Sequence, residues 1–305
     1  MAGLSAAVAA ALTAVYFFWG GTYLAMRFAV ETLPPFTTAG IRFVCAGALV
    51  FCWQMARGAA RPTAAHWKGA AAIGLLMLTA GNGGVMWAER TVPSGLAAIV
   101  IATVPLWMAL LAWLWQGGGR PGARAGWGLA TGFAGTVLLV GNADGTAAGV
   151  DWTGYAVLVG AAVAWAAGSL YSRVAPLPAA PLTGIALQML TGGAGCLLAG
   201  LADGEWAGLD LAAVTPRALL ALGYLIFFGS IVGYSAYIWL LKAADPVLVS
   251  TYAYVNPVVA VALGWLLAGE TLTPRDAAAA ALIVLSVVAI TRAKARARPA
   301  ESDED

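Results

Sequence analysis

Charged side chains are scarce in this chain of 305 residues: only 10% are Asp, Glu, Lys or Arg, whereas 61% are hydrophobic. Soluble domains carry about 25% charged and about 45–50% apolar residues. Water cannot solvate most of such a surface, so the composition places the chain among integral membrane proteins. The net charge of +2 lacks the basic excess typical of nucleic-acid binding. The expected partner is therefore the lipid bilayer rather than nucleic acid.

Histidine and cysteine are nearly absent as well. The one histidine, His66, lies in a loop beside Trp67, and Cys45, Cys52 and Cys196 fall inside apolar stretches without a C-x-x-C spacing. These counts argue against a zinc site, a disulfide framework and a histidine proton relay. The sequence also contains no H-E-x-x-H, G-x-S-x-G or P-loop motif. We therefore expect neither an enzyme nor a bound cofactor or metal.

The apolar residues form stretches long enough to span a membrane. About 20 apolar residues cross a hydrocarbon core about 30 Å thick, and they must be helical because lipid offers the backbone no hydrogen-bond partners. Proline, glycine and polar residues separate the stretches. The pattern predicts an all-α membrane protein whose ten spans cover residues 6–29, 36–56, 68–89, 94–115, 124–141, 153–174, 181–202, 216–241, 246–267 and 275–292.

Marker residues show that the pattern occurs twice. Pairs of identical residues 146 positions apart (165 − 19 = 146) are Trp19 and Trp165, Leu24 and Leu170, Arg27 and Arg173, Pro35 and Pro181, and Gly47 and Gly193. Five spans per copy return the chain to the opposite side of the bilayer, so the second copy must be inverted. Inverted repeats around a shared site are a frequent transporter architecture.

The predicted units are a first five-helix repeat at residues 1–142 and an inverted second repeat at 153–292. They are followed by a disordered cytoplasmic tail at 293–305. Lys and Arg in the loops set the orientation. With the N-terminus inside, eleven basic residues face the cytoplasm and three, Arg90, Arg217 and Arg275, face outward. Both termini are therefore expected to be cytoplasmic. Arg27 and Arg42 are left out of this count as residues within or near the membrane.

Polar and aromatic side chains inside spans are the candidates for substrate contact, because burying them in lipid is costly. Deep aromatic residues can line an amphipathic pocket, and Asn82 and Asn256 can face it. For each of them the alternative is a packing or interhelical hydrogen-bonding role. The predicted substrate-binding residues are Trp19, Tyr23, Asn82, Met86, Trp165, Ser169, Tyr234, Tyr237, Tyr254 and Asn256.

Two prolines occupy matching positions in the copies. Pro105 and Pro257 each remove a backbone donor inside a span and predict a bend. We interpret both as gating or bending residues. Glu89, at the outer end of a span, is the one carboxylate that we consider for proton coupling; a salt bridge with Arg42 or Arg90 is the structural alternative.

Several strings of residues resemble a known family. They are Phe18–Tyr23, Ala39–Phe43, Val92–Gly95, Ala102–Pro105, Trp165–Ser169, Phe228–Ser230, Tyr252–Pro257 and Gly269–Glu270. In this order and spacing the chain resembles the drug/metabolite transporter superfamily, specifically its ten-span exporters with EamA domains. The resemblance implies a bacterial inner-membrane protein with a central cavity between the repeats. It also implies export of amino acids, related metabolites or toxic amphiphiles by alternating access.

We therefore predict a secondary active transporter that exports small organic metabolites, amino acids or related compounds, coupled to protons or to a counter-substrate. Two alternatives stay open at this point. One is a multidrug exporter of lipophilic cations, which needs an embedded carboxylate. The other is a membrane scaffold or sensor that transports nothing and acts through its tail.

Overall fold

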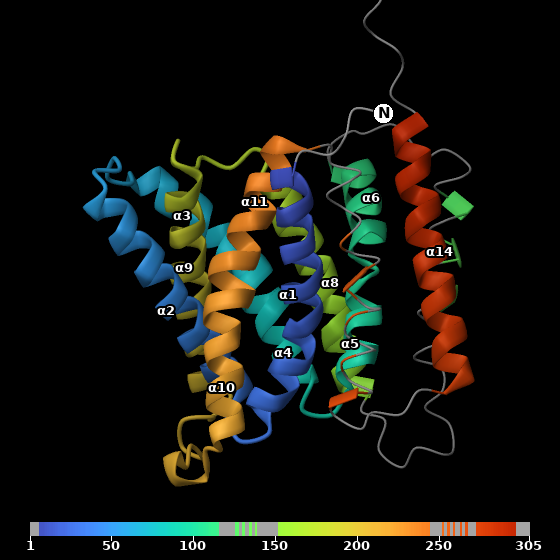
Figure 1. Cartoon of the computed structure of the whole chain (residues 1–305), viewed down its shortest axis with the longest axis horizontal. Coiled ribbons are helices and arrows are strands. Elements are labelled where there is room, and N and C mark those ends of the chain that lie inside the picture. Colours follow the sequence, from blue (N-terminus) through green and yellow to red (C-terminus); the bar gives the residue numbers. More distant parts are fainter. Residues whose placement is uncertain are drawn as a thin grey trace, which may run out of the picture.

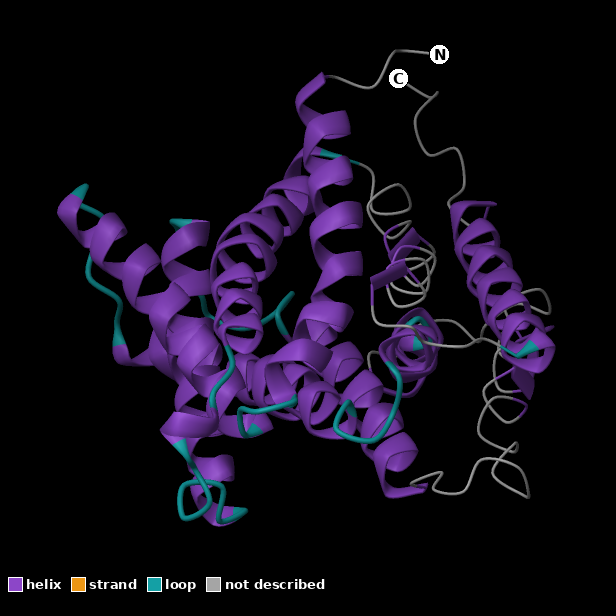
Figure 2. Ribbon diagram, turned by 60° about the horizontal axis from the view of Figure 1, so that its bottom comes forward, coloured by secondary structure: helices purple, strands orange, loops and turns teal. Residues whose placement is uncertain are grey.

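The structure is a computed structural model that describes residues 6–115, 152–244 and 273–296, together with 126, 127, 130, 131, 134, 135, 138, 252, 255, 256, 259, 263, 266 and 267. The regular structure of these described residues is entirely helical (Figure 2). Seven helical segments in this part of the chain are long and apolar enough to cross a membrane: Ala6–Val30, Pro35–Ala56, Ala64–Ala88, Ser94–Trp115, Trp152–Tyr171, Pro181–Ala202 and Pro216–Tyr237. The predicted spans at 124–141 and 246–267 lie largely outside the described residues.

The first three spans contain both regular and widened helix. Helices α1 (Ala6–Val30) and α2 (Pro35–Ala56) are continuous. The third span is divided into α3 (Ala64–Ile73), a π-helix η1 (Gly74–Gly83) and α4 (Gly84–Ala88). His66 belongs to a capping box at the start of α3, where its backbone N–H donates to Oγ1 of Thr63. This structural role accounts for the single histidine of the sequence.

The fourth span breaks where the sequence places a proline. Helix α5 (Ser94–Ile101) ends at Ala102, and α6 (Val104–Trp115) begins one residue before Pro105. At the break the carbonyl oxygen of Val100 accepts from the backbone N–H of Thr103 at 3.0 Å and from its hydroxyl at 2.6 Å, so this turn is hydrogen-bonded. A gating role for Pro105 stays a prediction, and Pro257 lies outside the described residues.

The second half of the chain repeats these elements. Helices α8 (Trp152–Tyr171) and α9 (Pro181–Ala202) are followed by the short 3-10 helix η3 (Leu211–Ala213). The next span consists of α10 (Pro216–Tyr224), a second π-helix η4 (Leu225–Val232) and α11 (Gly233–Ala243). The long helix α14 (Pro274–Arg296) lies at the edge of the bundle beside α5 and α6 (Figure 1).

Helices α2 and α9 form the most extensive contact and run antiparallel. A Cβ on Gly40 would lie 3.0 Å from the carbonyl oxygen of Gly193, and a Cβ on Gly47 would lie 3.0 Å from that of Ala186. Residue numbers therefore rise along α2 as they fall along α9. At one end the side chain of Gln54 reaches Thr183, at 3.4 Å. Small residues let the two backbones approach this closely.

The other contacts between the halves are reciprocal. The π-helix η1 of the first half packs on α8 and α9, whereas η4 of the second half packs on α1 and α2. Figure 1 shows α10 and α11 beside α1 in this arrangement. In each half the third helical segment thus packs on the first two helices of the other half.

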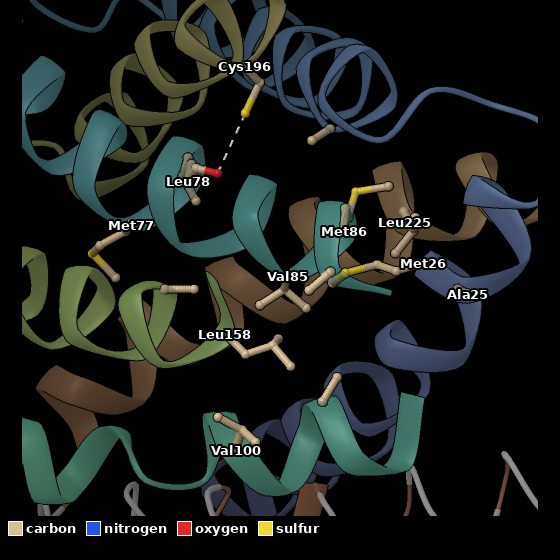
Figure 3. Packing of buried hydrophobic residues seen from close by; sticks show 14 of the residues in the cluster. Ala25, Met26, Met77, Leu78, Val85, Met86, Val100, Leu158, Cys196 and Leu225 are labelled. Atoms are coloured by element: carbon tan, nitrogen blue, oxygen red, sulfur yellow. Dashed lines mark hydrogen bonds between the residues drawn. The ribbon is translucent and has the colours of Figure 1, made fainter. Parts of the chain in front are cut away.

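Buried apolar side chains from both halves fill the interior of the bundle. Met77 and Leu78 from η1, Met86 from α4 and Leu225 from η4 are almost completely buried (Figure 3). Cys196 of α9 donates from its thiol to the carbonyl oxygen of Leu78 at 3.6 Å. This cysteine is therefore a packing residue, as its position in an apolar stretch indicates.

Candidate functional site

A cavity lies between the two halves, at the level of the two π-helices. Its unfilled space is about 860 Å³, counted together with the open solvent at its mouth. Residues Leu78 and Asn82 reach it from η1, and Gly229 and Ser230 reach it from η4. The aromatic side chains that line it are Trp19, Tyr23, Phe43, Trp165, Tyr234 and Tyr252, and the polar ones are Thr22, Arg42, Asn82, Ser230 and Asn256.

Six of the ten predicted substrate-binding residues line this cavity: Trp19, Tyr23, Asn82, Trp165, Tyr234 and Asn256. Three others do not. Met86 is fully buried in the apolar core, and the hydroxyl of Ser169 donates to the carbonyl oxygen of Trp165 at 2.8 Å. The ring of Tyr237 packs against that of Trp19, with centroids 5.0 Å apart. Tyr254 lies outside the described residues.

Trp19 of α1 is the centre of the aromatic wall. Its indole nitrogen donates to the carbonyl oxygen of Gly229 at 3.0 Å, so it joins α1 to η4. Its ring meets that of Trp165 edge-on, with centroids 6.3 Å apart, and that of Tyr252 at 5.3 Å. Gly233 leaves room for the indole, because a Cβ there would lie 2.5 Å from Nε1. The indole is therefore fixed on several sides.

The two π-helices are features that the sequence reasoning missed. They occupy equivalent places. In the later part of each copy the matching residues are 152 positions apart, as Pro105 and Pro257 are (257 − 105 = 152), and Gly81 and Gly233 have the same separation (233 − 81 = 152). Residues 74–83 of η1 then correspond to 226–235, which overlaps the observed range of η4 at residues 225–232. π-Helical turns are rare and often occur at functional sites. The glycines at 81, 83 and 84 and at 229 and 233 were the features of the sequence that could have indicated these π-helices.

Arg42 was also missed as a site residue. Arg42 was set aside in the orientation count as a residue within or near the membrane; its side chain is only 3% exposed and lines the cavity. Its Nε donates to the hydroxyl of Ser230 at 2.8 Å. Its position in the sequence could have indicated this: Arg42 follows Pro35, the first residue of α2, by seven residues, and two helical turns place it about 10 Å from the start of the helix.

Glu89 lies at the C-terminal end of α4 and is completely buried. The guanidinium of Arg27 donates to its backbone carbonyl oxygen. The charges of Glu89 and Arg42 interact through the low-dielectric interior. Arg90 instead stacks on Trp87, with Cζ 4.4 Å from the ring centroid. Glu89 is not among the described residues that line the cavity.

Polar contacts tie the halves together at the end of the bundle where α1 ends and α2 begins. The carboxylate of Glu205 accepts from the backbone N–H groups of Phe36 at 2.9 Å and Thr37 at 2.7 Å, so it caps α2 from the second half. The hydroxyls of Thr32 and Thr215 lie 3.5 Å apart. This end of the bundle is therefore held together by contacts between the repeats.

Apolar helices of membrane-spanning length that enclose a polar and aromatic cavity define a polytopic membrane transporter as the class of protein. Comparison with known proteins agrees. The model of the EamA-like transporter family matches residues 4–141 and again residues 152–292. The chain therefore belongs to the EamA-like transporter family, within the drug/metabolite transporter superfamily, and it carries two copies of the family's domain.

Several known proteins are similar along nearly the whole chain. The Escherichia coli (strain K12) protein named "Uncharacterized inner membrane transporter YedA" is 41% identical over 93% of this chain and 90% of its own length. The Bacillus subtilis (strain 168) protein named "Uncharacterized transporter YvbV" is 26% identical over 91% and 90%, respectively. A solved crystal structure with a TM-score of 0.63 and 23% identity covers 95% of this chain and 99% of its own chain, which supports the fold.

Proposed function

We propose that this protein is a secondary active transporter that exports small organic metabolites, amino acids or related compounds, across the bacterial inner membrane by alternating access. The observation that carries the proposal is a single cavity lined by matching π-helices from both halves. The relatives named as transporters support the activity, and one of them is named as an inner-membrane protein.

The proposed architecture is ten spans in two inverted five-helix repeats. Helices α2 and α9 begin at the equivalent residues Pro35 and Pro181, yet they run in opposite directions. Equivalent helices that run antiparallel support inversion of the second repeat. The proposed orientation has both termini in the cytoplasm, which rests on the loop charges.

Alternating access requires the polar contacts at the α1–α2 end to separate and re-form. Contacts between the repeats at that end are a hydrogen-bonded cap and two pairs of polar side chains. Side-chain bonds of this kind are individually modest in energy, so a transport cycle can break them. The proposed bends at Pro105 and Pro257 would accompany this movement.

The test is transport by the purified protein in liposomes. We expect efflux or counterflow of at least one amino acid or related metabolite, abolished when the cavity is blocked by Asn82→Trp. The control is Trp127→Ala, since Trp127 is exposed and is not a lining residue. Liposomes that move no amino acid, amine, organic acid or organic cation would contradict the proposed function.

Coupling to protons is proposed to involve Glu89. A carboxylate that is completely buried beside a cationic group can exchange a proton as the cavity changes its access. We expect Glu89→Gln to abolish accumulation driven by a pH gradient while leaving counterflow within about two-fold of the unmodified protein, because counterflow needs no net proton movement. Asp203→Asn is the control, because Asp203 is an exposed carboxylate at the C-terminal end of α9. Unchanged gradient-driven transport in Glu89→Gln would assign Glu89 a structural role.

A further inference from the structure

The charge within the cavity has one sign among the residues that the structure describes. Arg42 is a lining residue, whereas none of the described lining residues is Asp or Glu. A buried guanidinium carries a large desolvation cost unless hydrogen bonds and a counter-charge offset it. Glu89 interacts with the charge of Arg42 from outside the lining, so no described residue within the cavity itself balances the positive charge of Arg42. The cavity therefore favours a ligand that brings negative charge or strong acceptors.

The environment of Arg42 leaves one side of its guanidinium available. Nε is bonded to the hydroxyl of Ser230, and Cζ lies 4.7 Å from the ring centroid of Phe43. Nη2 lies against Gly229, where an added Cβ would come within 3.0 Å of it. Nη1 is buried and has no hydrogen-bond partner among the described residues. The donors of Nη1 are thus positioned for a ligand by a fixed side chain.

A second buried group in the same cavity also lacks a partner. Asn256 is 4% exposed and lines the cavity, and its Oδ1 accepts no hydrogen bond from the described residues. Buried polar atoms are almost always satisfied in folded proteins. A donor without an acceptor at Arg42 and an acceptor without a donor at Asn256 are complementary to a ligand that carries both.

The remaining wall is aromatic. Trp19 and Trp165 meet edge-on beside the cavity, and the hydroxyl of Tyr234 is occupied by its bond of 2.8 Å to Oε1 of Gln188. These side chains present apolar ring surface rather than free polar groups. They suit an aliphatic or aromatic portion of a ligand, and their ring faces also suit an ammonium group.

We propose that the cavity recognises a carboxylate, held by Nη1 of Arg42, and that the substrates are carboxylate-bearing compounds with an apolar or aromatic portion. An N–H of the same compound donates to Oδ1 of Asn256. Guanidinium–carboxylate bonds are charge-assisted and about twice as strong as neutral ones, so the carboxylate is the anchor. This inference rests on the proposed transport function and narrows its substrate class. It also argues against lipophilic cations, which would meet the positive charge of Arg42.

The first test uses matched compounds and the unmodified protein. Binding to the protein in nanodiscs is measured by calorimetry for L-phenylalanine and 3-phenylpropanoate, and for L-phenylalanine methyl ester and phenethylamine, in which the carboxylate is masked or missing. A parallel series based on L-leucine covers aliphatic side chains. We expect the carboxylates to bind about 10- to 100-fold more tightly than the compounds without one. Equal binding of both sets would overturn the inference.

The second test changes Arg42. Arg42→Met should weaken carboxylate binding about 10- to 100-fold. The affinity of Arg42→Lys should lie between those of Arg42→Met and the unmodified protein, because lysine keeps the charge but lacks the planar guanidinium. Arg57→Met is the control, because Arg57 is an exposed residue at the other end of α2. Size-exclusion profiles establish that each variant is folded, and the compound series needs no variant at all. Unchanged carboxylate selectivity in folded Arg42→Met would overturn the inference.

The outcomes separate the inference from the function on which it rests. If liposomes move esters, amines or cations as readily as carboxylates, the transport function stands and the carboxylate site is wrong. If no compound of either set binds or moves, the proposed function itself is contradicted.

Discussion

Gly233→Ala is expected to remove most transport activity while the protein still folds. The added Cβ would lie 2.5 Å from Nε1 and 2.7 Å from Cδ1 of Trp19, and 3.0 Å from the carbonyl oxygen of Phe228. The indole must then move and lose its bond to Gly229, which changes the shape of the aromatic wall. Such overpacking costs about 1–3 kcal/mol in a well-packed interior.

The measurement is counterflow in liposomes together with the thermal stability of the purified variant. We expect transport to fall by about ten-fold or more and Tm to fall only modestly. Gly223→Ala is the matched control, since Gly223 lies ten residues earlier in the same span and has no atom within 4 Å of an added Cβ. Equal transport by the two variants would show that the position of Trp19 is irrelevant to the cycle.

Gly192→Ala is expected to destabilise the protein strongly. A Cβ on Gly192 would lie 2.7 Å from the carbonyl oxygen of Gly74 and 2.7 Å from Cβ of Leu78. The first of these is a backbone atom, so it cannot move aside without separating α9 from η1. The same contact includes the hydroxyl of Thr79, which donates to the carbonyl oxygen of Gly192 at 2.8 Å. We expect a loss of about 3 kcal/mol or more.

Thermal unfolding in detergent and the yield of monodisperse protein report this loss. Gly160→Ala provides the control, because an added Cβ at Gly160 has open space around it and alanine favours a helix over glycine. If both variants melt at the same temperature, the close contact between α9 and η1 does not hold the repeats together.

The spans and the repeat were predictable because they depend on coarse properties of the sequence. Length and apolarity locate a span, and a proline such as Pro181 marks its beginning because it fits the first helical turn. Matched prolines and tryptophans then reveal the duplication. The described helices follow the predicted spans at residues 6–115 and 152–244, and the family comparison finds the domain twice.

The details of the cavity were less predictable, because they depend on which face of a helix each residue occupies. Trp19 and Met86 are both large and deep in the sequence pattern, but only Trp19 reaches the cavity. Arg42 was set aside as a residue within or near the membrane and was not predicted to line the cavity. Packing by Ser230 and Phe43 instead holds it inside. No periodicity in the sequence encodes such contacts between distant segments.

The π-helices were missed for a related reason. Hydropathy and helical periodicity treat every span as a regular helix, whereas a widened turn depends on packing against another helix. Gly74 and Gly81 allow that packing in η1 because they carry no Cβ to obstruct α9 and α8. Pro105 did mark a break in the fourth span, because the loss of a backbone donor is a local effect.

A reversible cross-link between Thr32 and Thr215 tests most directly whether one cavity serves the two ends of the bundle in turn. The two hydroxyl oxygens lie 3.5 Å apart and belong to different repeats. Cysteines at both positions, in a protein whose native Cys45, Cys52 and Cys196 are replaced by alanine, would lock this end closed when oxidised. We predict that counterflow stops on oxidation and returns on reduction, and that neither single-cysteine protein responds. Full counterflow through the cross-linked protein would contradict alternating access.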